Sequence, residues 1–269
     1  MIAEFAGGLL TNSLALLADA GHMLSDVAAL SLSLFAIWIA ERPPTPRQTY
    51  GYLRAEILAA LANGATLIVI SILIFVEAYH RLWQPPDVLG AGMFVIAVGG
   101  LVVNLIGLWL LHGGRGESLN VHGAWLHVLT DALGSVGAIV AGGLILAFGW
   151  EWADPVASIL IGLLVVYSSC WLLGASVSVL LESAPKGIDV DDVRRTLKTV
   201  PGVLAVHDLH VWSITSGLNC LSAHVVSATG QVHATRLQNL RDAMHQRFGI
   251  DHVTIQIEPE GFDERTVHD

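Results

Sequence analysis

The sequence predicts a bundle of transmembrane α-helices followed by a small domain of mixed helices and strands. Of the 269 residues, 54% are hydrophobic and only 13% are charged, whereas a soluble domain averages about 25% charged residues. Five apolar runs are long enough to cross a bilayer. From about residue 183 the chain loses this character and alternates at helical and then at strand spacing. These three observations predict the fold class.

The apolar runs each approach or exceed the roughly 20 residues that a bilayer-crossing helix needs. They cover residues 21–41, 57–79, 90–111, 122–148 and 155–181. The breaks between them carry Pro, Gly or charged residues, as helix ends do. The opening MIAEFAGGLLTNS is too short to cross about 30 Å of hydrocarbon, so we expect a truncated first helix, from a misplaced start or a fragment. The membrane domain is expected to cover residues 1–182.

The basic loop residues predict the orientation of the chain. Arg42, Arg47 and Arg54 flank the first long loop, and Arg115 lies in a loop two spans later. Cytoplasmic loops carry an excess of Lys and Arg. Both loops, and the polar tail that begins at residue 183, are therefore expected in the cytoplasm.

The tail, residues 183–269, predicts a small two-layer domain. Its pattern gives a helix, two strands, a second helix and a third strand, in the order αββαβ. Such an order places the helices on one face of a sheet.

A repeated motif lies inside the apolar runs. HMLSD spans residues 22–26 and HVLTD spans residues 127–131. Residues four apart share one face of a helix, so each helix presents an imidazole and a carboxylate together. An ionisable group at the bilayer centre costs at least about 2.5–3.5 kcal/mol and marks ion pathways. Two nitrogens and two oxygens suit tetrahedral Zn²⁺, so His22, Asp26, His127 and Asp131 are predicted to bind one metal ion.

Three classes of membrane protein could use such a site. A metal exporter explains ligands in the membrane. A metalloenzyme is disfavoured, because HExxH is absent and four protein ligands leave no position for water. A membrane metal sensor or scaffold that does not transport stays open as the alternative. The net charge of −10 argues against a nucleic-acid partner, and the absence of GxxxxGK[ST] argues against a nucleotide.

Other polar residues in the apolar runs are expected to have roles other than direct metal binding. Asn63 and Asn104 are expected to form hydrogen bonds between helices. Asp19, one turn before His22, could start a helix, bond across a dimer or assist metal entry.

Four segments of the membrane part resemble the cation diffusion facilitator family of divalent-metal transporters, namely LLADAGHMLSD, YGYLRAEILAALANG, LHVLTDALGSVG and ADPVASILIG. HDLHVW and VTIQIE in the tail resemble the cytoplasmic domain of the same family. The resemblance implies a homodimer of six-helix subunits, each with a ferredoxin-like cytoplasmic domain. It also implies a bacterial inner-membrane protein of the zinc, cobalt and cadmium resistance type that exports Zn²⁺ in exchange for protons. Co²⁺, Cd²⁺ and Fe²⁺ stay open as substrates, because affinities for divalent metals overlap.

The tail carries a second candidate metal site. Adjacent strands could bring together His207, His224, His252 and Glu258, and the resemblance implies zinc binding there that tightens the dimer. His233 is a further candidate ligand. His210 is left out, because a spacing of three in a strand points to the opposite face from His207.

Overall fold

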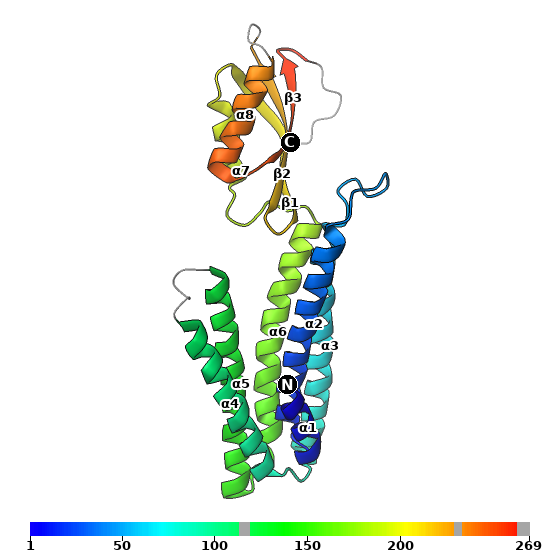
Figure 1. Cartoon of the computed structure of the whole chain (residues 1–269), viewed down its shortest axis with the longest axis vertical. Helices are drawn as coiled ribbons and strands as arrows, with labels where there is room; N and C mark the ends of the chain where they lie inside the picture. Colours follow the sequence, from blue (N-terminus) through cyan, green and yellow to red (C-terminus); the bar gives the residue numbers. More distant parts are fainter. Residues whose placement is uncertain (113–118, 229–232, 263–269) are drawn as a thin grey trace. The chain divides into compact units, whose positions relative to one another are not determined.

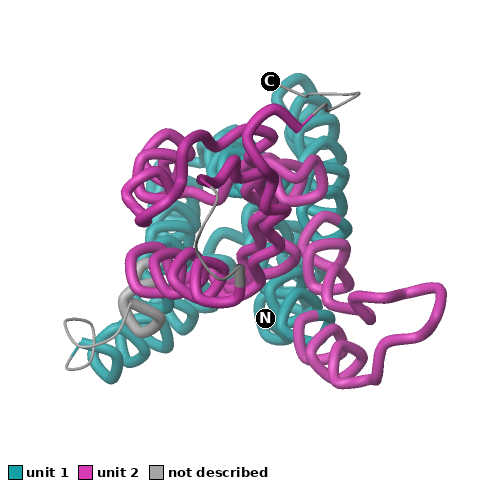
Figure 2. The backbone as a smooth tube through the Cα atoms, turned by 90° about the horizontal axis from the view of Figure 1, so that it is seen from above, with its two compact units in different colours: residues 1–32, 62–173 teal, residues 33–61, 174–269 magenta. Residues whose placement is uncertain are grey.

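The computed structural model describes residues 1–112, 119–228 and 233–262, without the side chains of residues 119–123, 126 and 233. Arg115 and the side chain of His233 lie outside the described residues. The chain divides into two compact units, which Figure 2 colours separately. Unit 1 comprises residues 1–32 and 62–173, and unit 2 comprises residues 33–61 and 174–269.

Six helices occupy the N-terminal part of the described chain (Figure 1). They are α1 (Ile2–Thr11), α2 (Leu14–Ala40), α3 (Ala55–Trp83), α4 (Gly90–His112), α5 (Leu119–Phe148) and α6 (Ala153–Leu180). The last five contain stretches long and apolar enough to cross a membrane. Each exposes large apolar side chains, which is expected of a surface that faces lipid.

The helical fold class is confirmed, with one difference at the first long span. This helix begins at Leu14, seven residues before the predicted position 21. Asp19 was a candidate helix start, since polar residues often mark helix ends. Both residues lie inside the helix, and Asp19 is buried among its neighbours.

A break separates α1 from α2. Asn12 ends α1 in the left-handed conformation, with φ of 56°, which Asn tolerates better than most residues. Ser13 follows, and its Oγ accepts a hydrogen bond from the Leu16 N–H at 3.2 Å, as a helix N-cap does.

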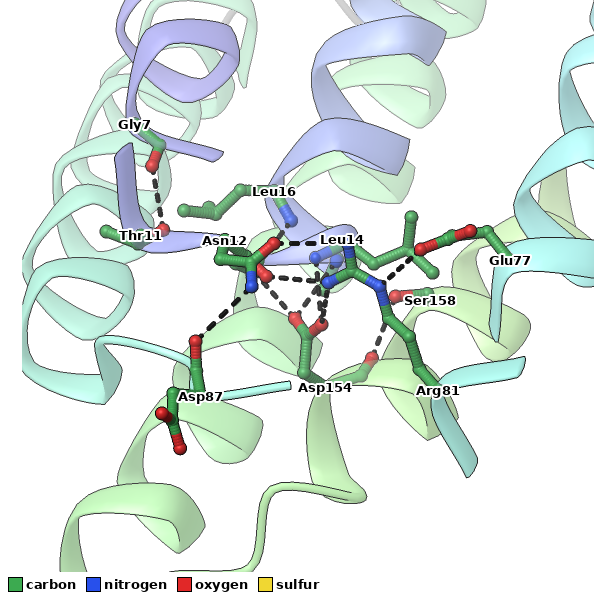
Figure 3. Close-up of polar contacts among 12 residues, drawn as sticks. Gly7, Thr11, Asn12, Leu14, Leu16, Glu77, Arg81, Asp87, Asp154 and Ser158 are labelled. Carbon is green, nitrogen blue, oxygen red and sulfur yellow. Dashed lines mark hydrogen bonds and ion pairs between the residues drawn. The ribbon is translucent and has the colours of Figure 1, made fainter. Parts of the chain in front are cut away.

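The start of α2 is also capped from another helix (Figure 3). The fully buried carboxylate of Asp154, in the first turn of α6, accepts hydrogen bonds from the N–H groups of Leu14 at 2.8 Å and Ala15 at 3.1 Å. It also accepts one from the Ser13 hydroxyl at 2.6 Å. The first N–H groups of a helix have no partner in their own helix, and the helix dipole favours an anion there. Asp154 therefore ties α6 to the helix that carries His22 and Asp26.

Arg81, in the last turn of α3, joins the same network. Its Nε donates to Glu77 at 2.8 Å and its Nη1 donates to the Asn12 carbonyl at 2.6 Å. The guanidinium lies 3.8 Å from the Asp154 carboxylate. This end of unit 1 is thus held by contacts among α2, α3, α6 and the α1–α2 break.

The C-terminal part of unit 2 contains a three-stranded sheet and two helices. The elements run α7 (Val190–Lys198), β1 (Val203–Thr215), β2 (Leu218–Ser227), α8 (His233–Phe248) and β3 (His252–Pro259). β2 lies in the centre, antiparallel to β1 and parallel to β3. Helices α7 and α8 lie on one face of the sheet (Figure 1). Their apolar side chains pack around Leu221, Ala223 and Val225. The predicted order αββαβ is confirmed.

Candidate metal centres

The HMLSD and HVLTD motifs lie on α2 and α5, both within unit 1. One hydrogen bond between helices involves the first motif, and another lies one turn beyond the second motif. The Ser25 hydroxyl bonds to the Asn63 Oδ1 of α3 at 2.8 Å, and the Asn104 amide of α4 donates to the Ser135 hydroxyl of α5 at 3.3 Å. The bonds predicted for Asn63 and Asn104 are confirmed.

The four motif side chains converge on one point. His22 Nε2 lies 3.7 Å from an oxygen of Asp26 and 3.6 Å from one of Asp131. His127 Nε2 lies 3.4 Å from an oxygen of Asp26 and 3.8 Å from one of Asp131. Each residue offers one ligand atom, and the four atoms lie within 4.8 Å of one another.

These separations fit a tetrahedral metal site. Ligand atoms at about 2.0–2.2 Å from Zn²⁺ lie about 3.3–3.6 Å apart along the edges of a tetrahedron. The four nitrogen–oxygen separations of 3.4–3.8 Å match or slightly exceed this range. Small side-chain shifts would close the set around one ion, and the two carboxylates would balance its two positive charges.

The side chains of the four residues differ in exposure. Those of Asp131 and His22 are 10% and 13% exposed, whereas that of His127 is 47% exposed. His127 therefore lies on the more exposed side of the cluster and Asp131 on its more buried side.

A second cluster lies on the sheet of unit 2. His207 Nε2 lies 3.0 Å from Glu258, and His224 Nδ1 lies 3.1 Å from the other Glu258 oxygen. The three residues offer ligand atoms within 4.8 Å of one another. His207 and His224 are partners across β1 and β2, so the sheet register sets their proximity.

His252 does not join this cluster, which corrects the prediction. The parallel register places His252 beside Cys220 and Gln256 beside His224. The spacing between strand residues is about 3.3 Å, so His252 lies about four residues from His224 along the sheet. Its Nε2 instead lies 3.3 Å from the Tyr50 hydroxyl.

The placement of His210 is also corrected. His207 pairs with His224 and His210 with Ser222, so β1 has one extra residue between these pairs and forms a β-bulge. The bulge puts His207 and His210 on the same face. Asp208, with φ of 47°, lies 3.0 Å from His210 and 3.6 Å from His224. Asp208 is not among the site residues predicted from the sequence. Its position between His207 and His210 was the only indication of it.

Comparisons with known proteins identify two family domains in the chain. The cation efflux transmembrane domain matches residues 1–181, and the cytoplasmic domain of cation efflux proteins matches residues 185–260.

Curated bacterial proteins are similar along nearly the whole chain. The cadmium, cobalt and zinc/H(+)-K(+) antiporter of Bacillus subtilis is 50% identical over 265 residues, covering 97% of this chain and 85% of that protein. The zinc transporter ZitB of Escherichia coli is 46% identical, with coverage of 96% and 83%. A solved structure, the metal-bound C-terminal domain of the CzcD transporter from Cuprividus metallidurans, is 39% identical over 26% of this chain and 99% of that chain, with a TM-score of 0.26.

The match over both domains excludes an enzyme and indicates an integral protein of the bacterial inner membrane with a cytoplasmic C-terminal domain. The chain belongs to the cation efflux, or cation diffusion facilitator, family of divalent-metal transporters.

Proposed function

We propose that this chain exports Zn²⁺ from the cytoplasm in exchange for protons, with His22, Asp26, His127 and Asp131 as its transport site. The observation that carries the proposal is the set of four nitrogen–oxygen separations of 3.4–3.8 Å within the membrane bundle. We also propose that residues 1–182 form the membrane-spanning domain.

Proton exchange follows from the chemistry of the ligands. Zinc binds neutral imidazole and ionised carboxylate, so metal and protons compete for the same atoms. Imidazole titrates near neutral pH, which lets both ions occupy the site under cellular conditions. A site that opens alternately to each side then exchanges one ion for the other. The name of the Bacillus subtilis relative includes both zinc and H⁺, which supports this coupling.

Other divalent metals are candidate substrates as well. The same relative is named for cadmium and cobalt besides zinc, and we include Co²⁺, Cd²⁺ and Fe²⁺ as secondary substrates. Two imidazoles and two carboxylates form a tetrahedral set that favours zinc, because geometry rather than raw affinity separates these metals.

Residues 183–269 are proposed to form a cytoplasmic domain that dimerises and binds metal. His207, His224 and Glu258 supply three ligand atoms within 4.8 Å of one another, a donor set that fits Zn²⁺. The matched cytoplasmic domain is a dimerisation domain by its family model, which supports a homodimer.

Zinc flux into proteoliposomes tests the transport proposal. Purified full-length chain is reconstituted, a pH step is applied, and zinc is followed with an indicator dye. Asp131→Ala is expected to abolish flux, because it removes the most buried ligand. Asp87→Asn is the matched control, since it also neutralises an aspartate but lies exposed between α3 and α4.

Three outcomes separate the function classes. Flux that depends on Asp131 and on the pH step supports the exporter. Zinc binding without flux by the wild type would support a sensor instead. Full flux by Asp131→Ala would contradict the transport site.

A further inference from the structure

We propose that Asp19 is a positioning residue for the transport site and orients the His22 imidazole through a water held between the two side chains. This inference rests on the proposed function, since it concerns the same site.

Asp19 lies three residues before His22 on α2, and residues at this spacing share one face of a helix. It is only 4% exposed. A carboxylate inside a membrane bundle is costly and is retained where it has a role. Asp19 is not one of the four residues whose ligand atoms lie within 4.8 Å, so its role lies outside the ligand set.

The two nitrogens of the His22 ring differ in their contacts with the described residues. Its Nε2 faces Asp26 at 3.7 Å and Asp131 at 3.6 Å. Its Nδ1 is buried and has no hydrogen-bond partner among the described residues. A buried ring N–H is costly when it is left unpaired.

A small cavity of about 30 Å³ lies beside the ring. Its polar lining consists of Asp19, His22, Thr130, Asp131 and Ser168. A water needs a cavity of roughly 10–15 Å³ and two to four polar partners. The cavity is large enough for one water, and the polar side chains among its lining residues are the candidate partners.

Gly134, on α5, allows Asp19 to occupy this place. A Cβ at Gly134 would lie 3.1 Å from the Asp19 Oδ1, closer than most real Cβ contacts. The next glycine on the same helix, Gly137, has no heavy atom within 4 Å of such a Cβ. The close approach of Asp19 to α5 therefore depends on Gly134 in particular.

This arrangement has a known chemical use. A metal-binding histidine almost always donates its second ring N–H to a carboxylate, a carbonyl or a water. The acceptor fixes the tautomer and orientation of the ring and raises the basicity of the metal-binding nitrogen. A water between His22 Nδ1 and Asp19 would leave Nε2 free for the ion and aimed at the site centre.

Asp19→Asn tests the role of the charge. The loss of an outer partner typically costs 10–100-fold in metal affinity. We expect the KM for zinc flux to rise by about 10–100-fold while kcat changes much less. Zinc affinity of the detergent-purified full chain, measured after subtracting binding by Asp131→Ala, should weaken by a similar factor. Asp87→Asn should match the wild type in both measurements.

Gly134→Ala tests the position of Asp19 without altering any ionisable group. The new methyl group should displace the Asp19 carboxylate and raise the KM, whereas Gly137→Ala should not. The two variants make the same chemical change three residues apart on α5, so a general effect on the helix cancels. If Asp19→Asn fails to fold, the comparison of Gly134→Ala with Gly137→Ala still tests whether Asp19 positions His22.

The outcomes distinguish this inference from the proposed function. Wild-type KM in both Asp19→Asn and Gly134→Ala overturns the positioning role. Complete loss of zinc binding in folded Asp19→Asn, equal to that of Asp131→Ala, overturns it as well, because Asp19 would then be a ligand. If Asp131→Ala retains flux, the proposed function fails whatever Asp19 does.

Discussion

His22 and Asp26 meet His127 and Asp131 because both helices present a nitrogen and an oxygen one turn apart. Neither pair alone completes a tetrahedral site. Each imidazole nitrogen lies between the two carboxylates, at 3.4–3.8 Å. The identity of each ligand should therefore affect which metal the site accepts.

His22→Asp is expected to raise transport of Cd²⁺ relative to Zn²⁺. The substitution changes the donor set from two nitrogens and two oxygens to one nitrogen and three oxygens. A carboxylate can bind with one or both oxygens, which accommodates a larger ion. Initial rates in proteoliposomes with each metal give the ratio, and an unchanged ratio would contradict control of selectivity by His22.

Cys220 should make unit 2 less stable at alkaline pH. Burial raises the pKa of the Cys220 thiol above its usual value of 9.0, with Arg54 opposing the shift. Above pH 9 the folded state therefore holds this proton more tightly than the unfolded state. Ionisation of Cys220 does not affect the free energy of unfolding below pH 9. As the pH rises above 9, it lowers this free energy. Thermal unfolding from pH 8 to 10.5 should show a steeper loss for wild type than for Cys220→Ala, and parallel curves would contradict the shift.

At the scale of elements, the network around Asp154 anchors the start of α2. The carboxylate accepts hydrogen bonds from two N–H groups and from the Ser13 hydroxyl, and it lies beside Arg81. The anchor lies two to three turns before His22 and Asp26, the proposed ligands on α2. It therefore fixes the helix that presents them.

Asp154→Ala is expected to destabilise the bundle. Loss of a helix cap costs about 1–2 kcal/mol, which corresponds to roughly 2–8 °C in Tm for a chain of this size. Thermal unfolding in detergent measures the change. Thr66→Ala is the control, since the exposed Thr66 hydroxyl bonds only to the Ala62 carbonyl of its own helix among the contacts described. Equal melting temperatures for the two variants would show that the cap contributes little.

At the scale of the whole molecule, zinc should stabilise the C-terminal part of the chain. A ligand that binds only the folded state contributes about 2.7 kcal/mol at 100 times its Kd. Zinc is therefore expected to raise the unfolding temperature of the wild type, and His224→Ala should abolish the part of this shift that comes from the C-terminal domain. His252→Ala should retain it, because His252 lies away from His207 and Glu258. Loss of the zinc-induced temperature shift in His252→Ala would instead support the prediction that His252 is a fourth ligand.

Much of the fold could be predicted from the sequence. Apolar runs gave the five long helices, because length and hydropathy alone decide what can cross a bilayer. Strand alternation gave the three strands β1, β2 and β3 in their observed order. The limit of α2 was harder, since Asp19 resembles a helix start until its burial against α5 is seen.

The clustering of His22, Asp26, His127 and Asp131 was predictable because the spacing within each pair is local. A His and an Asp four residues apart share one face of a helix. Each pair therefore points either toward a partner helix or toward lipid. The cluster in the sheet depends on register, which hydrophobic alternation does not specify across strands. The bulge at Asp208 reverses the expected side of His210, and the parallel β2–β3 register separates His252 from His224.

Zinc K-edge X-ray absorption on the full-length chain tests the shared coordination site most directly. The cytoplasmic cluster is first disabled with His224→Ala, so that the membrane site supplies the signal. The account predicts one zinc with four nitrogen or oxygen ligands at about 2.0–2.2 Å, two of them imidazoles. Six-coordinate zinc with mainly water ligands, or a spectrum unchanged by Asp131→Ala, would contradict it.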